Sequence, residues 1–180
     1  MLISLTTISF LGIYCIEIGI NMKESSMLGE IDRIDRRILL YLQQDGRLSN
    51  AALAKKVHVS PATCHRRTQR LFDEGYVQGV RAIVAPERVE RGALVVVGVV
   101  LDRSTPQSFG EFEKVITKLP FILDCHLVAG DFDYFLKIRA RDIADFKRLH
   151  GEHLIALPGV RQTRTFFVMK EVIDNAALEF

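Results

Sequence analysis

The sequence predicts an α+β protein, with an N-terminal winged helix-turn-helix and a C-terminal ferredoxin-like βαββαβ sandwich. Two observations predict this architecture. Residues 30–84 contain three short segments whose apolar residues recur at helical spacing, each opened by a side chain suited to helix capping. Residues 93–172 alternate apolar, β-branched runs with amphipathic segments in the order strand, helix, strand, strand, helix, strand. A chain of 180 residues is long enough for two such small domains.

The first two helices are short and separately capped. The first is expected over 32–44, where Asp32 can serve as the N-cap and Gly46 follows the end. Its apolar positions at helical spacing are Ile34, Ile38, Leu39 and Leu42. Ser49 is the expected cap of a second helix, which runs to about Lys56.

The third helix has the clearest start signal in the chain. Ser60 can cap it, and Pro61 then occupies the first helical position, where the missing N–H costs nothing. The helix is expected to continue to Glu74, and Gly75 lies just beyond its end.

A wing and a linker are expected after the third helix. Residues 76–84 are interpreted as two short strands around Gly79, which would form a small hairpin. Residues 85–92 contain Pro86 and balanced charges without periodicity, and are therefore interpreted as the linker between the two domains.

The second domain is expected over 93–172, followed by a C-terminal tail over 173–180. It opens with the β-branched run 94–101, typical of a buried or central strand. A helix from Thr105 to Pro120 is expected next, followed by strands over 121–129 and 132–139 that a tight turn at Gly130-Asp131 joins. Asp142 is the expected cap of a second helix, whose apolar residues are Ile143, Phe146, Leu149 and Leu154. The last strand is expected over 160–169. This order predicts an antiparallel sheet with two helices on one face.

Charge is unevenly distributed, although the whole chain carries only +2. Residues 30–81 have ten Lys and Arg against six Asp and Glu, whereas residues 93–180 have eleven against twelve. Because attraction to a polyanion depends on where charge lies, the basic excess favours nucleic-acid contact by the first domain.

The third helix has the two faces that a DNA-reading helix requires. Cys64, Thr68 and Leu71 recur at i, i+4 and i+7 and are expected to face the first two helices. The predicted DNA contacts are Ser60, Ala62, Thr63, His65, Arg66, Arg67, Gln69 and Arg70. A run of arginines alone is more typical of a solvated helix face. Its combination with three capped helices and local positive charge favours double-stranded DNA as the partner.

Four blocks of sequence resemble the Lrp/AsnC family of leucine-responsive and asparagine-type regulators. They are IDRIDRRILLYLQQDGRLSNAALAKKV, VSPATCHRRTQRLFDEGYVQG, CHLVAGDFDYFLKIR and LPGVRQTRTFFVMKEV, which together span Ile31 to Val172. The resemblance implies a helix-turn-helix over 51–70, a regulatory domain over 93–172, and dimers that assemble to tetramers or octamers with amino acids bound between regulatory domains. The chain departs from the family pattern at Thr68, usually aliphatic, and at Val80, often aromatic.

A small-molecule effector, expected to be an amino acid, has two candidate loops in the second domain. Gly130-Asp131 and its neighbours offer backbone N–H groups and carboxylates, and the resemblance implies that this loop responds to the effector. The candidate residues are Ala129, Gly130, Asp131, Phe132, Asp133, Leu157, Pro158, Gly159, Thr163 and Thr165. The alternative interpretation is a plain hairpin turn, with both threonines filling the sheet. The apolar strands also favour sheet-to-sheet dimerisation, which would place two DNA-reading helices about 34 Å apart.

No cofactor, metal or catalytic role is expected. His150 and His153 share a helix, but the sequence places no third ligand beside them. Cys125 and His126 adjoin in a strand, so their side chains should point to opposite faces and cannot form a nucleophile pair. Three scattered cysteines without a C-x-x-C pair fit a reducing cytoplasm.

The first residues of the chain raise the question of a membrane span. Residues 1–20 are apolar, yet no Lys or Arg precedes them and Glu17 interrupts them. Met22 and Met27 lie just before the first capped helix, so residues 1–29 are interpreted as an extension from a start codon placed too early. A membrane-tethered sensor is the alternative.

The function that follows is a sequence-specific, amino-acid-responsive transcription regulator. The alternative from another class is an amino-acid-binding module that acts through protein partners and uses the first domain for docking. The two differ in whether the basic face of the third helix is needed.

Overall fold

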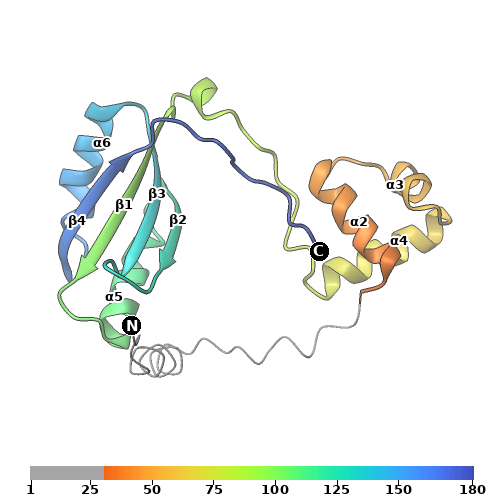
Figure 1. Cartoon of the computed structure of the whole chain (residues 1–180), viewed down its shortest axis with the longest axis horizontal. Coiled ribbons are helices and arrows are strands. Elements are labelled where there is room, and N and C mark those ends of the chain that lie inside the picture. The colour runs from red at the N-terminus through yellow and green to blue at the C-terminus, as the bar shows by residue number, and fades with distance from the viewer. Residues whose placement is uncertain (1–30) are drawn as a thin grey trace, which may run out of the picture. The chain divides into compact units, whose positions relative to one another are not determined.

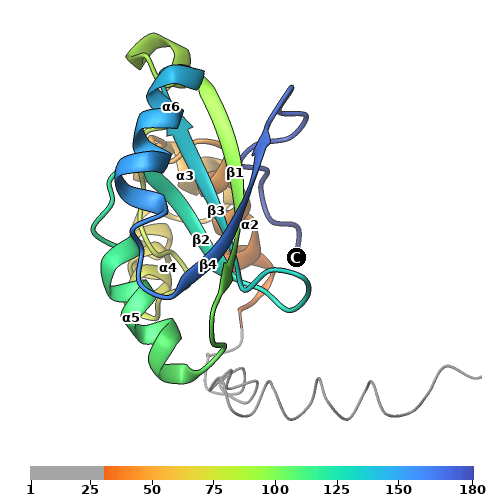
Figure 2. The same cartoon turned by 90° about the vertical axis from the view of Figure 1, so that its left-hand side faces the viewer.

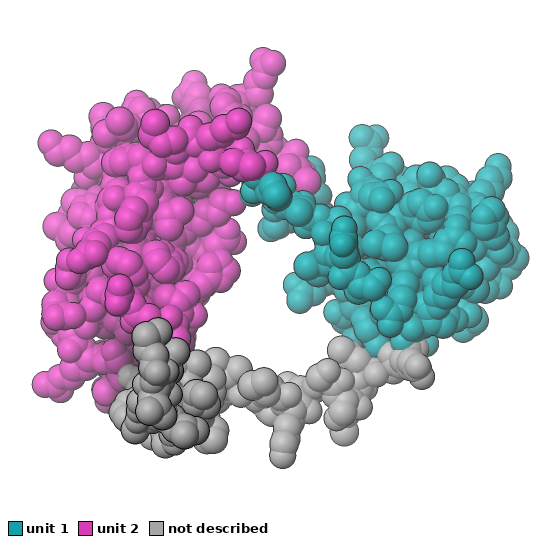
Figure 3. Space-filling view, viewed as in Figure 1, with its two compact units in different colours: residues 1–82, 173–180 teal, residues 83–172 magenta. Residues whose placement is uncertain are grey.

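The protein is described by a computed structural model over residues 31–180, so the interpretation of residues 1–29 concerns a segment outside the described range. No helix within the described range is long and apolar enough to cross a membrane. The chain divides into two compact units, shown in different colours in Figure 3. The helical unit extends to Ala82 and includes Ile173–Phe180, and the sheet unit is Ile83–Val172.

The helical unit contains the three predicted helices (Figure 1). They are α2 (Arg33–Gln44), α3 (Asn50–Val57) and α4 (Pro61–Asp73). The predicted caps are confirmed, because the side chains of Asp32, Ser49 and Ser60 each accept a hydrogen bond from a backbone N–H in the first turn. The core between the helices consists of Ile38, Leu39, Leu53, Ala54, Val57, Cys64 and Leu71.

The predicted wing is wrong. Residues 76–84 contain no strand. The backbone N–H of Val77 instead donates to the carbonyl of Leu71, and Tyr76 and Val77 pack against the helical core. Gly79 does not have a positive φ, so the tight turn that a two-stranded hairpin needs is missing.

The sheet unit has the predicted βαββαβ order (Figures 1 and 2). After a 3₁₀ turn (Pro86–Val89), its elements are β1 (Ala93–Leu101), α5 (Pro106–Ile116), β2 (Ile122–Leu127), β3 (Tyr134–Ala140), α6 (Ile143–Leu149) with a π-helical turn (His150–Leu154), and β4 (Val160–Phe167). The strands are antiparallel in the order β2-β3-β1-β4. Figure 2 shows α5 and α6 on one face of the sheet, as the sequence predicts.

The two faces of the sheet differ in what covers them. Val95, Val97 and Val99 of β1 are buried in the core that α5 and α6 cover. The opposite side, called here the open face, carries Val96, Gly98 and Val100 of β1, Phe135 of β3, and Arg164 and Phe166 of β4. Ile143 was expected among the apolar positions of α6 but is 67% exposed, because it occupies the first turn directly after the Asp142 cap.

Stability of the sheet unit is expected to depend on acid pH through Asp145. Its buried carboxylate accepts hydrogen bonds from the Arg141 backbone and the Arg148 guanidinium, which lower its pKa from 3.8 to about 2. Because the folded-state pKa is depressed, the ionised Asp145 carboxylate stabilises the folded state above pH 4. This stabilisation is lost as the pH falls toward 2. Urea midpoints should fall over that range, and Asp145→Asn should remove this part of the pH dependence. An identical profile in both proteins would contradict the assignment.

The C-terminal tail contacts the helical unit. The Gln43 side chain accepts a hydrogen bond from the backbone N–H of Leu178 (2.7 Å) and donates one to its carbonyl (3.2 Å). Just before the tail and within the sheet unit, Glu171 forms an ion pair with buried Arg139. The last residues are therefore held by specific hydrogen bonds to α2.

Candidate nucleic-acid interface and ligand-binding loops

The start of α4 is fixed by its own side chains. Ser60 accepts a hydrogen bond from the Thr63 backbone N–H (3.2 Å) and donates one from its hydroxyl to the Thr63 hydroxyl (2.9 Å). Pro61 has no N–H, so among the first three helical residues only the Ala62 N–H is left without a partner within the helix. This end of α4 can therefore bind an anion such as a phosphate.

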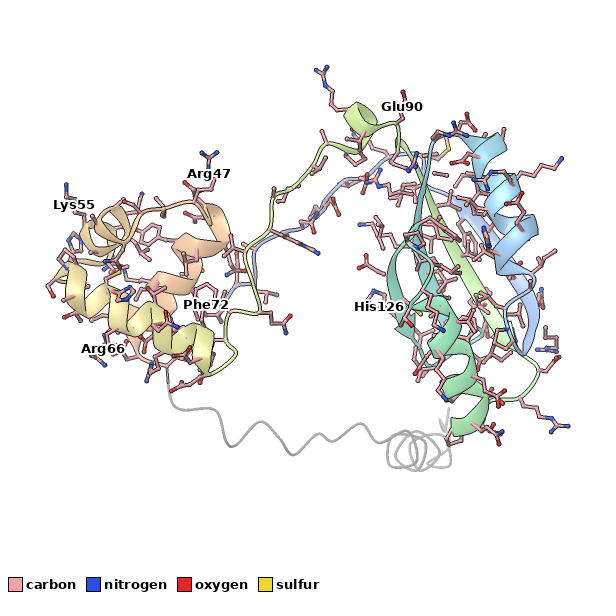
Figure 4. The ribbon with its side chains drawn as sticks, turned by 180° about the vertical axis from the view of Figure 1, so that it is seen from behind. Arg47, Lys55, Arg66, Phe72, Glu90 and His126 are labelled. Carbon is pink, nitrogen blue, oxygen red and sulfur yellow. The ribbon has the colours of Figure 1, made fainter. Side chains whose placement is uncertain are left out.

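One face of α4 is exposed along its length. Ala62, His65, Arg66 and Gln69 are all exposed, and their spacing puts them on one side of the helix. Gln69 donates a hydrogen bond to Asp73 one turn later (2.9 Å). In Figure 4, Arg66 projects away from the helical unit, as does Lys55 of α3. We call Ala62, His65, Arg66 and Gln69 the reading face. It carries side chains that can bond to base edges and phosphates.

Two of the predicted DNA contacts form ion pairs with another helix of the protein. Arg67 forms ion pairs with Asp32 (2.7 Å) and Asp35 (2.9 Å), and Arg70 forms one with Asp35 (2.6 Å). Asp35 is only 1% exposed. Hydrogen bonds to Asp35 and Asp32 raise the pKa of Arg67, so this guanidinium remains charged. The predicted set thus divides into three groups: Ser60 and Thr63 at the cap of α4, the four residues of the reading face, and a pair of arginines held against α2.

Sequence reasoning missed this network although its signal is present. Asp32 and Asp35 are three apart at the start of α2, and Arg67 and Arg70 are three apart on α4. Matching i, i+3 pairs of opposite charge on two packed helices are the pattern that could have indicated it. What the sequence does not give is the register between the two helices.

Thr68 faces the helical core as predicted, but its buried hydroxyl has no hydrogen-bond partner among the described residues. An unpaired buried hydroxyl costs about 1–3 kcal/mol. Thr68→Val is therefore expected to raise the free energy of unfolding by about 1 kcal/mol, measured by urea denaturation. The matched control is Thr63→Val, which removes a hydroxyl that Ser60 binds and should bring no gain. A less stable Thr68→Val protein would contradict the expectation.

The loop between β2 and β3 is longer than the predicted turn. The strands end at Leu127 and resume at Tyr134, and the loop closes by a hydrogen bond from the Val128 N–H to the Asp133 carbonyl (2.9 Å). Ala129, Gly130 and Asp131 are exposed at its tip. The Asp133 carboxylate is occupied, since it accepts hydrogen bonds from the Leu101 N–H and the Ser104 hydroxyl (2.8 Å each). The exposed tip is therefore the part of the loop left for a ligand.

The second predicted loop, Leu157 to Gly159, lies at the same end of β1. The Gly159 carbonyl accepts a hydrogen bond from the Asp102 N–H (2.8 Å), one residue beyond the Leu101 N–H that binds Asp133. Leu157 is buried, Pro158 is partly buried and Gly159 is exposed. The structure thus brings the two predicted loops together around the end of β1.

The two predicted threonines lie on the other side of the sheet from Phe132. Thr163 pairs with Val99 and Thr165 with Val97, which places them on the face that α5 and α6 cover. The Thr163 hydroxyl is within 3.0 Å of His150 Nε2. Phe132 packs on the open face, because a Cβ added to Gly98 would meet its ring at 2.6 Å. The predicted effector residues therefore do not form one cluster.

Phe132 is the centre of an aromatic group on the open face. Its ring lies 5.2 Å from that of Phe135, 6.4 Å from that of Phe166, and 5.8 Å from the Arg164 guanidinium. Half of the Phe166 side chain remains exposed. These rings lie together and form a contiguous apolar surface, in contrast to single exposed apolar residues scattered over a protein.

The sequence predicts no metal-binding or nucleophilic role for the histidines and cysteines of the chain. Residues 31–180 contain no group of three or more His, Cys, Asp or Glu that could hold a metal ion. Cys125 pairs with Leu136 and His126 with Phe135, so these neighbours point to opposite faces, as predicted. Burial raises the pKa of the Cys125 thiol to about 11, which keeps it protonated near neutral pH.

Comparisons with known proteins match both units. The AsnC-type helix-turn-helix domain matches residues 31–71, and the Lrp/AsnC ligand binding domain matches residues 94–178. The leucine-responsive regulatory proteins of Klebsiella pneumoniae and Escherichia coli K12 are each 47% identical over 149 residues, 83% of this chain and 91% of theirs.

Solved structures give the same match. A Neisseria meningitidis transcriptional regulator in complex with L-Met is 31% identical with a TM-score of 0.79, covering 83% of this chain and 97% of its own. An AsnC family transcriptional regulator from Agrobacterium tumefaciens is 28% identical with a TM-score of 0.78 and the same coverage.

Proposed function

Because the chain belongs to the Lrp/AsnC family of DNA-binding transcription regulators, which are not enzymes, we propose that the reading face of α4 enters the major groove of duplex DNA. Arg66 and Gln69 are the side chains that suit base edges, and Ser60 with the neighbouring Ala62 N–H suits a phosphate. The observation that carries the proposal is the exposure of Ala62, His65, Arg66 and Gln69 on one side of α4, while Cys64 and Leu71 are buried in the helical core.

Salt dependence of DNA binding tests this proposal. We expect the wild-type protein to bind a duplex selected from a random pool. The logarithm of its affinity should fall linearly with the logarithm of the salt concentration. If Arg66 contacts a phosphate or an adjacent base edge, Arg66→Ala should weaken binding by about tenfold and lower the slope by up to about 0.9. Arg161→Ala, an exposed arginine of the sheet unit, is the control. Unchanged binding by Arg66→Ala would favour the alternative in which the helical unit docks to proteins.

We also propose that the chain responds to an amino acid at the loops around the end of β1. The exposed tip of 129–131 and the neighbouring Gly159 support this site, and the similar Neisseria regulator is a complex with L-Met. Thr163 and Thr165 would contribute only from the other side of the sheet. Calorimetric titration with the twenty amino acids, repeated on Asp131→Ala, tests the site. If one amino acid gives the same binding heat with the wild type and with Asp131→Ala, the binding site must lie elsewhere.

The open face is the proposed dimer interface. Its aromatic group around Phe132 is apolar and partly exposed, and burying it against a second copy would remove that surface from water. A two-fold dimer would present two α4 helices to successive turns of DNA, and further assembly to tetramers or octamers is part of the proposal. We expect the regulator to act in the cytoplasm, where bacterial DNA lies.

A further inference from the structure

We propose that Arg67 and Arg70 do not contact DNA but clamp α4 onto Asp35 of α2, and so set the rotation of α4 that turns its reading face outward. They are positioning residues. This inference rests on the proposed function of α4, and the experiment below separates the failure of one from the failure of the other.

The clamp is built around one buried carboxylate. Oδ1 of Asp35 accepts a hydrogen bond from Arg67 (2.9 Å), and Oδ2 accepts one from Arg70 (2.6 Å). Oδ2 also accepts one from the Asp32 backbone N–H (3.3 Å), which completes the capping box of α2. The same carboxylate therefore caps α2 and holds two side chains of α4.

Asp32 secures the second end of the clamp. Its Oδ1 accepts hydrogen bonds from the backbone N–H groups of Ile34 and Asp35, and its Oδ2 accepts one from Arg67 (2.7 Å). Because Asp32 is fixed as the N-cap, the Arg67 guanidinium is bound between two immobile carboxylates.

The arginines cannot leave this site without leaving a buried charge behind. Asp35 is nearly inaccessible to water, and removing its partners would strand a carboxylate in a low-dielectric interior. The Nε atoms of Arg67 and Arg70 are also buried, without a hydrogen-bond partner among the described residues. The inner edge of each guanidinium is thus enclosed by the protein rather than offered to a phosphate.

Helical geometry explains why two arginines are needed. Arg67 and Arg70 are three residues apart and reach the same carboxylate from successive turns of α4, which fixes both its rotation and its axial position. Arg66 and Gln69 each precede one of them by a single residue, about 100° around the helix. Holding Arg67 and Arg70 against α2 therefore keeps Arg66 and Gln69 turned away from α2.

The test is DNA binding by Arg67→Ala, Arg70→Ala and the charge-preserving Arg70→Lys, with a selected duplex and poly(dI-dC) as probes. We expect Arg67→Ala and Arg70→Ala to lower affinity for the selected duplex by about tenfold or more, with the salt slope and poly(dI-dC) affinity kept at wild-type values. Arg70→Lys, which can still reach one oxygen of Asp35, should recover part of the loss. In an Asp35→Asn background, Arg70→Ala should have a smaller effect.

A salt slope lowered by about 0.9 in Arg67→Ala or Arg70→Ala would overturn the inference, because it would count a lost phosphate contact. Equal losses on both probes would also overturn it. If either alanine variant fails to fold, Arg67→Gln and Arg70→Gln are measured, because glutamine also removes the charge, and a slope lowered by about 0.9 there has the same meaning. Arg66→Ala is carried in parallel. If that variant binds as the wild type does, the proposed function fails, whatever the clamp variants show.

Discussion

Asp35→Ala is expected to lower the free energy of unfolding of the helical unit by about 3–5 kcal/mol, the cost of breaking a buried ion pair from one side. Among the described residues, Asp35 is the ion-pair partner of Arg70 and one of two partners of Arg67, so the variant removes both contacts and also half of the capping box of α2. Two guanidinium groups would then be left partly buried against an apolar gap.

Hydrogen exchange of α2 and α4 amides, together with urea denaturation, measures this loss. Amides of the sheet unit should keep their protection, since the network lies wholly within the helical unit. Glu74→Ala, which removes an exposed carboxylate at the end of α4, is the matched control and should change stability by less than about 0.5 kcal/mol. A loss below about 1 kcal/mol in Asp35→Ala would mean that the arginines find other partners.

Gly98→Val is expected to destabilise the sheet unit strongly. A Cβ at this position would lie 2.6 Å from the Phe132 ring, and the valine methyl groups would enter it. Phe132 would be expelled from the open face, with a loss of about 2–3 kcal/mol and a collapse of the proposed dimer interface. If the proposed interface forms, sedimentation velocity should show the wild type as a dimer or larger species and the variant as a monomer.

A second substitution separates this steric cause from a general effect on the strand. Phe132→Ala in the Gly98→Val background should restore much of the stability, because the clashing ring is gone. Gly110→Ala, at a helical position with nothing within 4 Å of the added Cβ, should not destabilise. If Gly98→Val remained assembled and stable, the proposed role of Phe132 at the interface would be wrong.

Features set by neighbouring residues could be predicted from the sequence. The caps at Asp32, Ser49 and Ser60, and the burial of Cys64 and Leu71, depend on contacts within a few residues or on helical period. The βαββαβ order likewise follows from the succession of strand and helix patterns.

Features set by distant residues could not be predicted. Arg67 and Arg70 bind an acid 32 and 35 residues earlier; the i, i+3 spacing of the charges is visible in the sequence, but the register of α4 against α2 that joins them is not. The wing failed because Val77 bonds back to Leu71 in place of pairing with a second strand. The β2–β3 loop opened because Asp133 bonds to Leu101 across the sheet. In each case a hydrogen bond that the periodicity of the segment does not reveal outweighed the local pattern.

The base preference of the reading face tests the central claim most directly. Binding-site selection from a random pool should be run in parallel on the wild type, Arg66→Ala and Gln69→Ala. If α4 reads bases through this face, each variant should lose its preference at one position in each half-site and keep the others, at a cost of about 1–3 kcal/mol per position. Identical base preferences in all three proteins would contradict the account.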